Sequence, residues 1–251
     1  ELLHEEIIFV ETHDDQETVA NIFTKYGFMA MPVVDKERRL TGIITFDDIM
    51  DVIEDEATED FQRMAAMMPS EEPYLDSGVI ELAKQRIPWL MILMIGATIT
   101  GGIITKFESI LSSVVVLTAF IPMIMDTGGN SGSQSSTLVI RGLATGDVTL
   151  KDARKIWWKE FRISLLVGVT LASVNFAKNM LIDRVGLEVS ITVSITVAAT
   201  VILAKMVGGT LPLAAKKLKL DPAIMAGPLI TTIVDALALM VYFGIATTLL
   251  F

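Results

Sequence analysis

Five long apolar stretches with few charges restrict the fold of this chain more than any other feature. They cover residues 87–105, 109–140, 157–182, 189–215 and 222–251. A helix needs roughly 20 apolar residues to cross a bilayer, and only helices and closed barrels satisfy their backbone polar groups there. The chain is 52% hydrophobic, with a mean hydropathy of +0.57. The sequence therefore predicts an α-helical membrane protein with five transmembrane helices.

The N-terminal third differs from the rest in charge. Residues 1–86 hold 21 acidic and 7 basic residues, a balance of −14, whereas residues 87–251 hold 9 acidic and 13 basic, a balance of +4. An acidic soluble domain is not expected to bind nucleic acid, and its charge serves either metal cations or solubility. We expect three parts: a small α/β domain at 1–56, an acidic linker and connecting helix at 57–86, and a transmembrane domain at 87–251.

The chain has no cysteine, and its two histidines are His4 and His13. Disulfides and thiolate metal sites are therefore excluded, and a catalytic zinc site is not expected. The first residue is Glu and no signal peptide pattern precedes the acidic region, so we expect a piece of a longer protein.

The acidic domain is predicted to alternate strands and helices, with strands at 7–10, 31–34 and 40–45 and helices at 16–26 and 47–54. The phrases AMPVVD (30–35) and LTGIITFDD (40–48) resemble a cystathionine-β-synthase (CBS) domain. In that family the second phrase contacts the ribose and phosphates of adenine nucleotides, which implies Gly42, Thr45 and Asp48 as a site for ATP. The alternative is a helix cap and a turn without ligand. CBS domains pair, so a partner domain is expected from elsewhere.

The second predicted helix continues into an acidic run. Asp51, Asp55 and Glu59 recur at i, i+4, and each like-charge pair opposes the helix by roughly 0.2–0.5 kcal/mol. A bound divalent cation would reverse that effect, which makes these residues a candidate regulatory metal site. A solvated acidic face is the alternative. Residues 69–73 then break the helix, and residues 75–86 are predicted to form an amphipathic helix leading into the membrane.

Basic residues gather in the linkers between predicted spans two and three and between spans four and five. By the positive-inside rule these linkers are cytoplasmic, so the N-terminal domain lies inside and the C-terminus outside the plasma (inner) membrane of a prokaryote. Trp89, Trp157 and Trp158 are then expected at the inner interface.

Two carboxylates lie inside predicted spans, and each has polar neighbours at helical spacing. Asp126 is followed by Asn130, Ser133 and Thr137, and Asp235 is preceded by Gly227 and Thr231. Pro228 cannot donate to the carbonyl of Ile224, which would leave a backbone oxygen free near the inner end of span five. Such oxygen ligands, without nitrogen or sulfur, suit Mg²⁺ or Ca²⁺.

The alternative for these polar stripes is helix packing, in which small residues allow close approach and polar side chains bond across helices. Packing explains the glycines well, notably Gly101, Gly102, Gly208 and Gly209. It explains Asp235 poorly, because a buried carboxylate needs a counter-charge. Lys205 is the one intramembrane cation available, although a lysine there more often snorkels.

Residues 126–128 also spell the Asp-Thr-Gly triplet of aspartic proteases. Soluble proteases carry that triplet on a β-loop, whereas here it falls in a predicted helix. The Gly-x-Gly-Asp pattern of intramembrane proteases is absent around Asp235. We therefore do not expect an enzyme.

Two segments together resemble the MgtE-type magnesium channel family. They are residues 122–146, with GGNSGSQSS at 128–136 and Arg141, and residues 221–235, DPAIMAGPLITTIVD. With the CBS module and five spans, the resemblance covers essentially the whole chain. Some family members carry an amide side chain where this chain has Gly227, and the N-terminal helical domain and first CBS domain of bacterial members have no counterpart here.

The resemblance implies a homodimer in the bilayer with a pore along its two-fold axis, lined by helices two and five. It implies that the pore imports Mg²⁺ down its electrochemical gradient and is closed by cytosolic Mg²⁺ through the acidic region. The implied Mg²⁺ site consists of Asp235, Asp126, Thr231, Gly227 and Gly129, and the implied pore-lining residues are Asn130, Ser133, Gln134 and Thr137. The alternatives are a divalent-cation carrier of other selectivity and a membrane-anchored nucleotide or metal sensor without transport.

Overall fold

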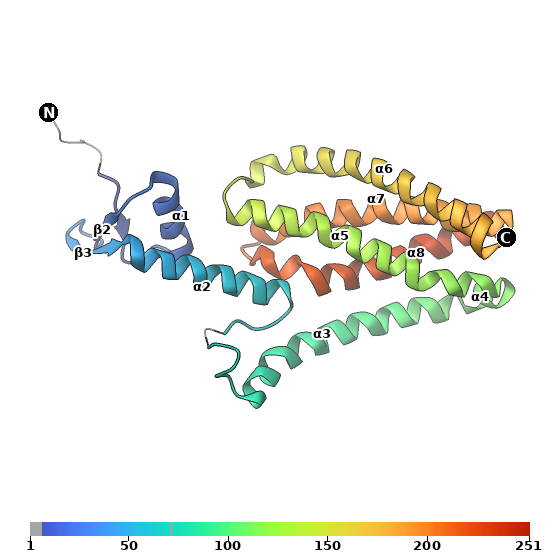
Figure 1. Cartoon of the computed structure of the whole chain (residues 1–251), viewed down its shortest axis with the longest axis horizontal. Helices are drawn as coiled ribbons and strands as arrows, with labels where there is room; N and C mark the ends of the chain where they lie inside the picture. The colour runs from blue at the N-terminus through green and yellow to red at the C-terminus, as the bar shows by residue number, and fades with distance from the viewer. Residues whose placement is uncertain (1–6, 71) are drawn as a thin grey trace. The chain divides into compact units, whose positions relative to one another are not determined.

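The computed structural model describes residues 7–70 and 72–251, and the chain divides into two compact units. The first extends to Phe61 and includes Pro69–Pro73, and the second consists of Gln62–Met68 and Tyr74–Phe251 (Figure 1). The expected boundary after residue 56 falls inside one continuous helix, α2 (Phe46–Met64). The three-part division remains a prediction.

The first unit has the predicted mixed α/β order. Its elements before α2 are β1 (Val10–Glu11), α1 (Gln16–Tyr26), β2 (Ala30–Val34) and β3 (Leu40–Thr45). The sheet order is β1-β2-β3, with β1 parallel and β3 antiparallel to β2. The prediction of a first strand at 7–10 is wrong, because only Val10 and Glu11 pair with β2 while Ile7 and Ile8 remain exposed.

The core of this unit forms where α1 and α2 meet the sheet. Val10, Val19, Phe23, Met31 and Ile49 are almost fully buried. The predicted helix at 47–54 and its expected continuation through the acidic run form one helix that runs to Met64, with Ile49 buried in the core.

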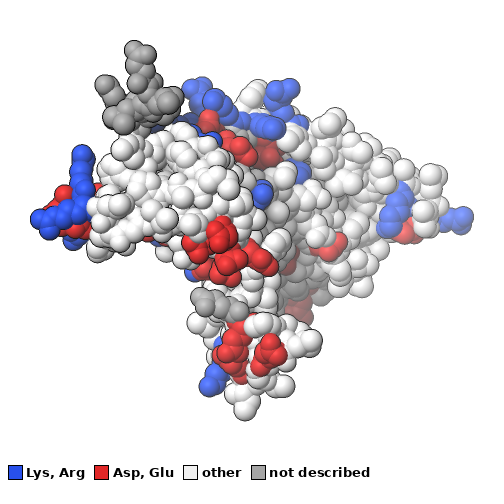
Figure 2. Space-filling view, turned by 60° about the vertical axis from the view of Figure 1, so that its left-hand side comes forward, with Lys and Arg blue, Asp and Glu red and all other residues white. Residues whose placement is uncertain are grey.

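The second unit consists of long helices joined by short turns (Figure 1). Its elements are α3 (Val79–Lys106), α4 (Glu108–Ser113), η1 (Val115–Phe120), α5 (Ile121–Ala144), η2 (Leu150–Asp152), α6 (Ala153–Lys178), η3 (Asn179–Asp183), α7 (Leu187–Lys217), η4 (Pro222–Met225) and α8 (Gly227–Leu250). Four helical segments of the described residues are long and apolar enough to cross a membrane: α3, Leu150–Asp183, α7 and α8. Helix α5 is also 24 residues long, but its polar residues lower its hydropathy. In the space-filling view charged side chains gather in groups and leave wide areas without charge (Figure 2).

The prediction of one span over residues 109–140 is wrong, because three helical segments occupy it. The backbone leaves helical geometry at Val114, with φ −133° and ψ 77°, where three valines follow one another. β-branched residues are poor helix formers, and Pro122, which has no N–H to donate, is accepted in the first turn of a helix. Helix α5 therefore starts at Ile121.

The predicted helix at 75–86 and the first span are one element. Helix α3 begins at Val79 and continues through Pro88 to Lys106, so no break separates the amphipathic part from the apolar part. Its middle is exposed in the single chain, in contrast to α7 and α8.

Helix α5 packs between α7 and α8, and the contacting residues give the helix directions. Gly128 lies against Thr200 and Gly132 against Ala204 and Gly208, so α5 and α7 run parallel. Gly128 lies against Ala238, whereas Ser136 bonds to Met225 of η4, so α5 and α8 run antiparallel. The α5–α6 and α7–α8 connections therefore lie at the same end of this unit, and the C-terminus lies at the other end, with α4 (Figure 1).

Candidate functional site

Asp126 and Asp235, the two carboxylates predicted to lie in the membrane, are on the neighbouring helices α5 and α8. These helices approach closely at Gly129, where a methyl group on the glycine would lie 3.1 Å from Cγ2 of Thr231. Asp126 lies three residues before Gly129, and Asp235 lies four residues after Thr231. Because the helices are antiparallel, both steps lead toward the same end, by about 4.5 and 6 Å. The two carboxylates are therefore at one level and close enough for their charges to interact.

The predicted polar stripe of α5 forms one side of that helix. Asp126, Asn130, Gln134 and Thr137 are exposed in the single chain and Ser133 is half-buried, whereas Ser131, Ser135 and Ser136 are buried against neighbouring helices. Asp235 and Thr231 on α8 are half-buried beside this stripe. The polar side chains of α5 thus divide into a packed set and an unpacked set.

The start of α8 corrects the prediction for Pro228. This proline occupies the first turn of α8 and does not interrupt a helix, so no helical hydrogen bond is lost at Ile224. The carbonyl of Pro228 accepts hydrogen bonds from the hydroxyls of Thr231 and Thr232, at 2.9 and 2.8 Å.

Gly227 has a positive φ of +34°, and a methyl group placed on it would lie 2.7 Å from the carbonyl oxygen of Met64. A side chain at this position would therefore be strained and would collide with backbone. Met64 also packs with Ile140, Ala223 and Ala226 at this end of α5 and α8. Gly227 can offer only its backbone to an ion.

Lys205 is 4% exposed, and its Nζ donates to Oε1 of Gln134 at 3.3 Å. The interpretation that it snorkels is therefore wrong. A second charged group, Glu160 of α6, is 7% exposed and accepts a hydrogen bond from the hydroxyl of Ser135 at 2.6 Å. Sequence reasoning did not single out Glu160, although it is an acid between Lys159 and Arg162 inside a predicted span. Consecutive residues of α5 are thus held by a buried anion and a buried cation.

The predicted nucleotide residues lie in the first unit. Oδ2 of Asp48 accepts hydrogen bonds from the hydroxyl of Thr45, at 2.5 Å, and from its backbone N–H, at 3.2 Å. The bond from the Thr45 hydroxyl is the main cause that lowers the pKa of Asp48. This is the helix-cap arrangement, and Gly42 is exposed opposite Val33. Asp48 also lines a cavity of about 340 Å³ with Val10 and Ile49, among other residues.

The predicted regulatory residues follow one side of α2. Asp51 and Asp55 are exposed and Glu59 is half-buried, one helical turn apart. Among residues 7–70 and 72–251, no group of three or more His, Cys, Asp or Glu side chains is placed to hold a metal ion. Neither this acidic side nor the Asp126–Asp235 pair is a complete protein site within one chain.

Two families match the sequence. The MgtE family, described as "Divalent cation transporter", matches residues 121–245, and the CBS domain family matches residues 1–55. The curated proteins named "Magnesium transporter MgtE" from Thermus thermophilus and Bacillus subtilis are each 38% identical, over 256 and 247 residues, and that from Enterococcus faecalis is 33% identical over 250 residues. These alignments cover 100%, 98% and 98% of the chain but only 55%, 54% and 54% of the relatives. The chain thus spans about half the length of the curated relatives it matches.

Proposed function

Because the chain belongs to the MgtE family of divalent cation transporters, which are not enzymes, we propose that it forms a magnesium-selective channel importing Mg²⁺ down its electrochemical gradient. The observation that carries the proposal is the meeting of Asp126 and Asp235 at one level beside the Gly129–Thr231 contact. Two carboxylates near each other repel unless a cation lies between or beside them. The carboxylates, the hydroxyl of Thr231 and the backbone near Gly227 offer oxygen ligands, which Mg²⁺ prefers.

Mg²⁺ usually keeps several of its waters when a site offers few carboxylates. We propose that the ion passes Asp235 largely hydrated and that Asp126 and Gly129 face the same site. Asn130, Ser133, Gln134 and Thr137 then line the path from this level toward the end at which α5 meets α6. Amide and hydroxyl groups suit this role because they can bond the waters of a hydrated ion.

We propose that the pore lies on the two-fold axis of a homodimer, between α5 and α8 of both copies. Support comes from the unpacked stripe of α5, because polar side chains are costly against lipid and are expected to face water or a partner. A second copy would also double the carboxylates around the ion, from two to four.

We propose that the N-terminal domain is cytoplasmic and that the C-terminus is outside the inner membrane. The α5–α6 and α7–α8 connections lie at one end and, together with the helix ends beside them, hold eight of the thirteen basic residues of residues 87–251, which are Arg141, Lys151, Arg154, Lys155, Lys159, Lys216, Lys217 and Lys219. The positive-inside rule assigns that end to the cytoplasm.

We propose that cytosolic Mg²⁺ binding along Asp51, Asp55 and Glu59 holds the acidic region in a closed state, and that ATP binds near Gly42, Thr45 and Asp48. The Mg²⁺ site is supported by the like charges one turn apart on α2, since a divalent cation would relieve their repulsion. The cavity beside Asp48 supports the second.

Protease protection tests the regulatory proposal. Millimolar Mg²⁺ is expected to slow cleavage between Glu54 and Arg86 of purified protein, because a bound ion would order the acidic region. The double variant D51N/D55N should lose this protection, and Na⁺ at equal ionic strength is the control. Equal cleavage with and without Mg²⁺ would exclude the sensor role of this region.

Ion flux into liposomes containing the purified chain tests the channel itself. Mg²⁺ is expected to enter, while Ca²⁺ and Na⁺ should enter at least tenfold more slowly if the site selects for a small hydrated divalent ion. Comparable Ca²⁺ entry would indicate a divalent carrier of other selectivity. No flux of any ion would indicate a membrane-anchored sensor and refute the proposal.

A further inference from the structure

A groove between α6 and α7 lies outside the α5–α8 pathway. It has a volume of about 630 Å³ and is lined by Leu150, Ala153, Arg154, Trp157, Gly209, Thr210, Leu213, Ala214 and Lys217. Gly209 and Leu213 are buried, whereas Trp157 and Lys217 are exposed at the sides. Cavities of 300–1,000 Å³ that are mostly apolar and have a few polar groups are typical of small-molecule sites.

The position of the groove relates it to the membrane surface. Along α7 it extends from Gly209 to Lys217, the last residue of that helix, which corresponds to about 12 Å. Along α6 it covers the first turns, and Trp157 is half exposed there, as tryptophans are at a membrane interface. One end of the groove is therefore at headgroup level and the other is inside the hydrocarbon region.

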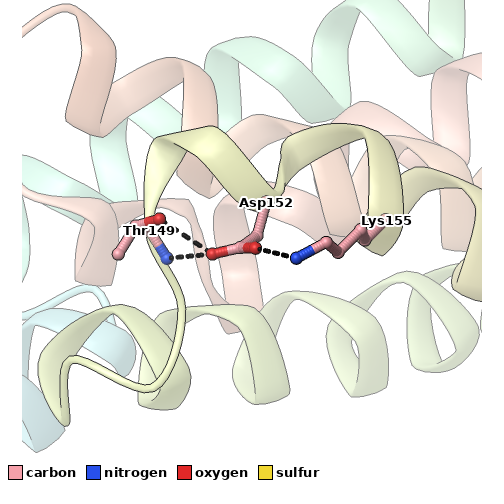
Figure 3. Close-up of polar contacts among 3 residues, drawn as sticks. All are labelled: Thr149, Asp152 and Lys155. Atoms are coloured by element: carbon pink, nitrogen blue, oxygen red, sulfur yellow. Dashed lines mark hydrogen bonds and ion pairs between the residues drawn. The ribbon is translucent and has the colours of Figure 1, made fainter.

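The charges of the groove are both positive and both lie at its headgroup end. Neither Arg154 nor Lys217 forms an ion pair with a carboxylate among the residues that the structure describes. The neighbouring Lys155, by contrast, donates to Oδ1 of Asp152 at 2.9 Å, and Oδ2 of Asp152 accepts from the hydroxyl and N–H of Thr149 (Figure 3). This capping arrangement fixes the turn that carries Leu150, so the lip of the groove is preformed while its two cations remain available.

We propose that this groove binds an anionic phospholipid, with the phosphodiester between Arg154 and Lys217 and part of an acyl chain along Gly209, Leu213 and Ala214. Charge complementarity identifies the occupant, since basic pockets between transmembrane helices bind anionic headgroups. Gly209 keeps the inner part of the groove open, because any side chain there would extend the wall. Such a side chain would also crowd Glu160, whose Cγ would lie 3.0 Å from a methyl group added to the glycine.

Native mass spectrometry of the full chain tests the site, with phosphatidylglycerol and phosphatidylcholine as probes. The wild-type chain is expected to retain phosphatidylglycerol in preference to phosphatidylcholine. The double variant R154Q/K217Q should bind phosphatidylglycerol roughly thirtyfold more weakly, since each basic side chain near the surface contributes about fivefold. The matched control is K151Q/K219Q, which removes the same charge at the same end but outside the groove and should bind like wild type.

Three outcomes would overturn the proposal. If both double variants lose phosphatidylglycerol binding equally, the lipid responds to the overall positive charge of this end and not to the groove. If inorganic phosphate at equal concentration displaces the lipid, the site binds only the anionic headgroup. A change of oligomeric state in R154Q/K217Q without lipid loss would mean that a second copy occupies the groove. A further variant, T210W, should exclude the acyl chain while keeping both basic side chains. If a folded T210W protein retains the lipid, the acyl chain does not lie along Gly209, Leu213 and Ala214. Because binding is measured without flux, the result is independent of the proposed channel.

Discussion

Replacing Asp235 by Asn is expected to abolish Mg²⁺ flux in liposomes while leaving a folded protein. The amide keeps the shape of the side chain and an oxygen ligand but removes the negative charge. Two unit charges 4 Å apart near a protein surface interact by about 4 kcal/mol, and Mg²⁺ carries two. Losing even half of that interaction energy would lower the occupancy of the site by Mg²⁺ more than tenfold. Folding should be unaffected or improved, because a half-buried charge beside Asp126 is removed.

The matched control for this substitution is Asp147→Asn in the α5–α6 connection. Asp147 is exposed and accepts a hydrogen bond from Thr145, and it lies far along the chain from both Asp126 and Asp235. Its variant should conduct like wild type. Asp126→Asn is expected to reduce flux less than Asp235→Asn, since Asp126 is the more exposed of the two. Normal Mg²⁺ flux through a monodisperse Asp235→Asn protein would refute the assignment of Asp235.

The polar side of α5 could be predicted from spacing alone. Helical periodicity puts Asp126, Asn130, Ser133 and Thr137 on one side of a helix, and the structure confirms that side as a distinct, unpacked one. What spacing could not predict is which helix faces which. The meeting of Asp126 with Asp235 depends on the Gly129–Thr231 contact between segments about a hundred residues apart, and no local pattern encodes such a contact.

The sequence also could not predict the environment of the buried charged residues Lys205 and Glu160. A lysine or a glutamate inside an apolar span looks like a residue whose charged end reaches the membrane interface. Lys205 and Glu160 are instead bonded to Gln134 and Ser135, because α7 packs against α5 and α6 packs against α7. Only the packing of three helices decides whether a charged side chain has a partner inside. The break at Val114, in contrast, had a local signal in the valine run before Pro122.

Gly208 of α7 lies so close to the backbone of α5 that this contact fixes the position of α5. A methyl group on Gly208 would be 2.2 Å from the carbonyl oxygen of Gly132 and 3.0 Å from its carbonyl carbon. Both atoms belong to the backbone of α5, so no side chain can rotate away to make room. Gly132 also faces Val234 and Ile230 of α8, which prevents α5 from moving simply toward that helix.

The substitution Gly208→Ala is therefore expected to lower the melting temperature in detergent and reduce the monodisperse fraction, at a cost of about 1–3 kcal/mol or more from overpacking. Because Ala is the better helix former by about 1 kcal/mol, helix propensity alone predicts the opposite sign. Gly244→Ala in α8 is the matched control, since no atom lies within 4 Å of the position that its new methyl group would take. It should be neutral or stabilising. If Gly208→Ala melts at or above the wild-type temperature, α5 and α7 do not approach through these two glycines, and the packing of α5 against α7 differs from the one described.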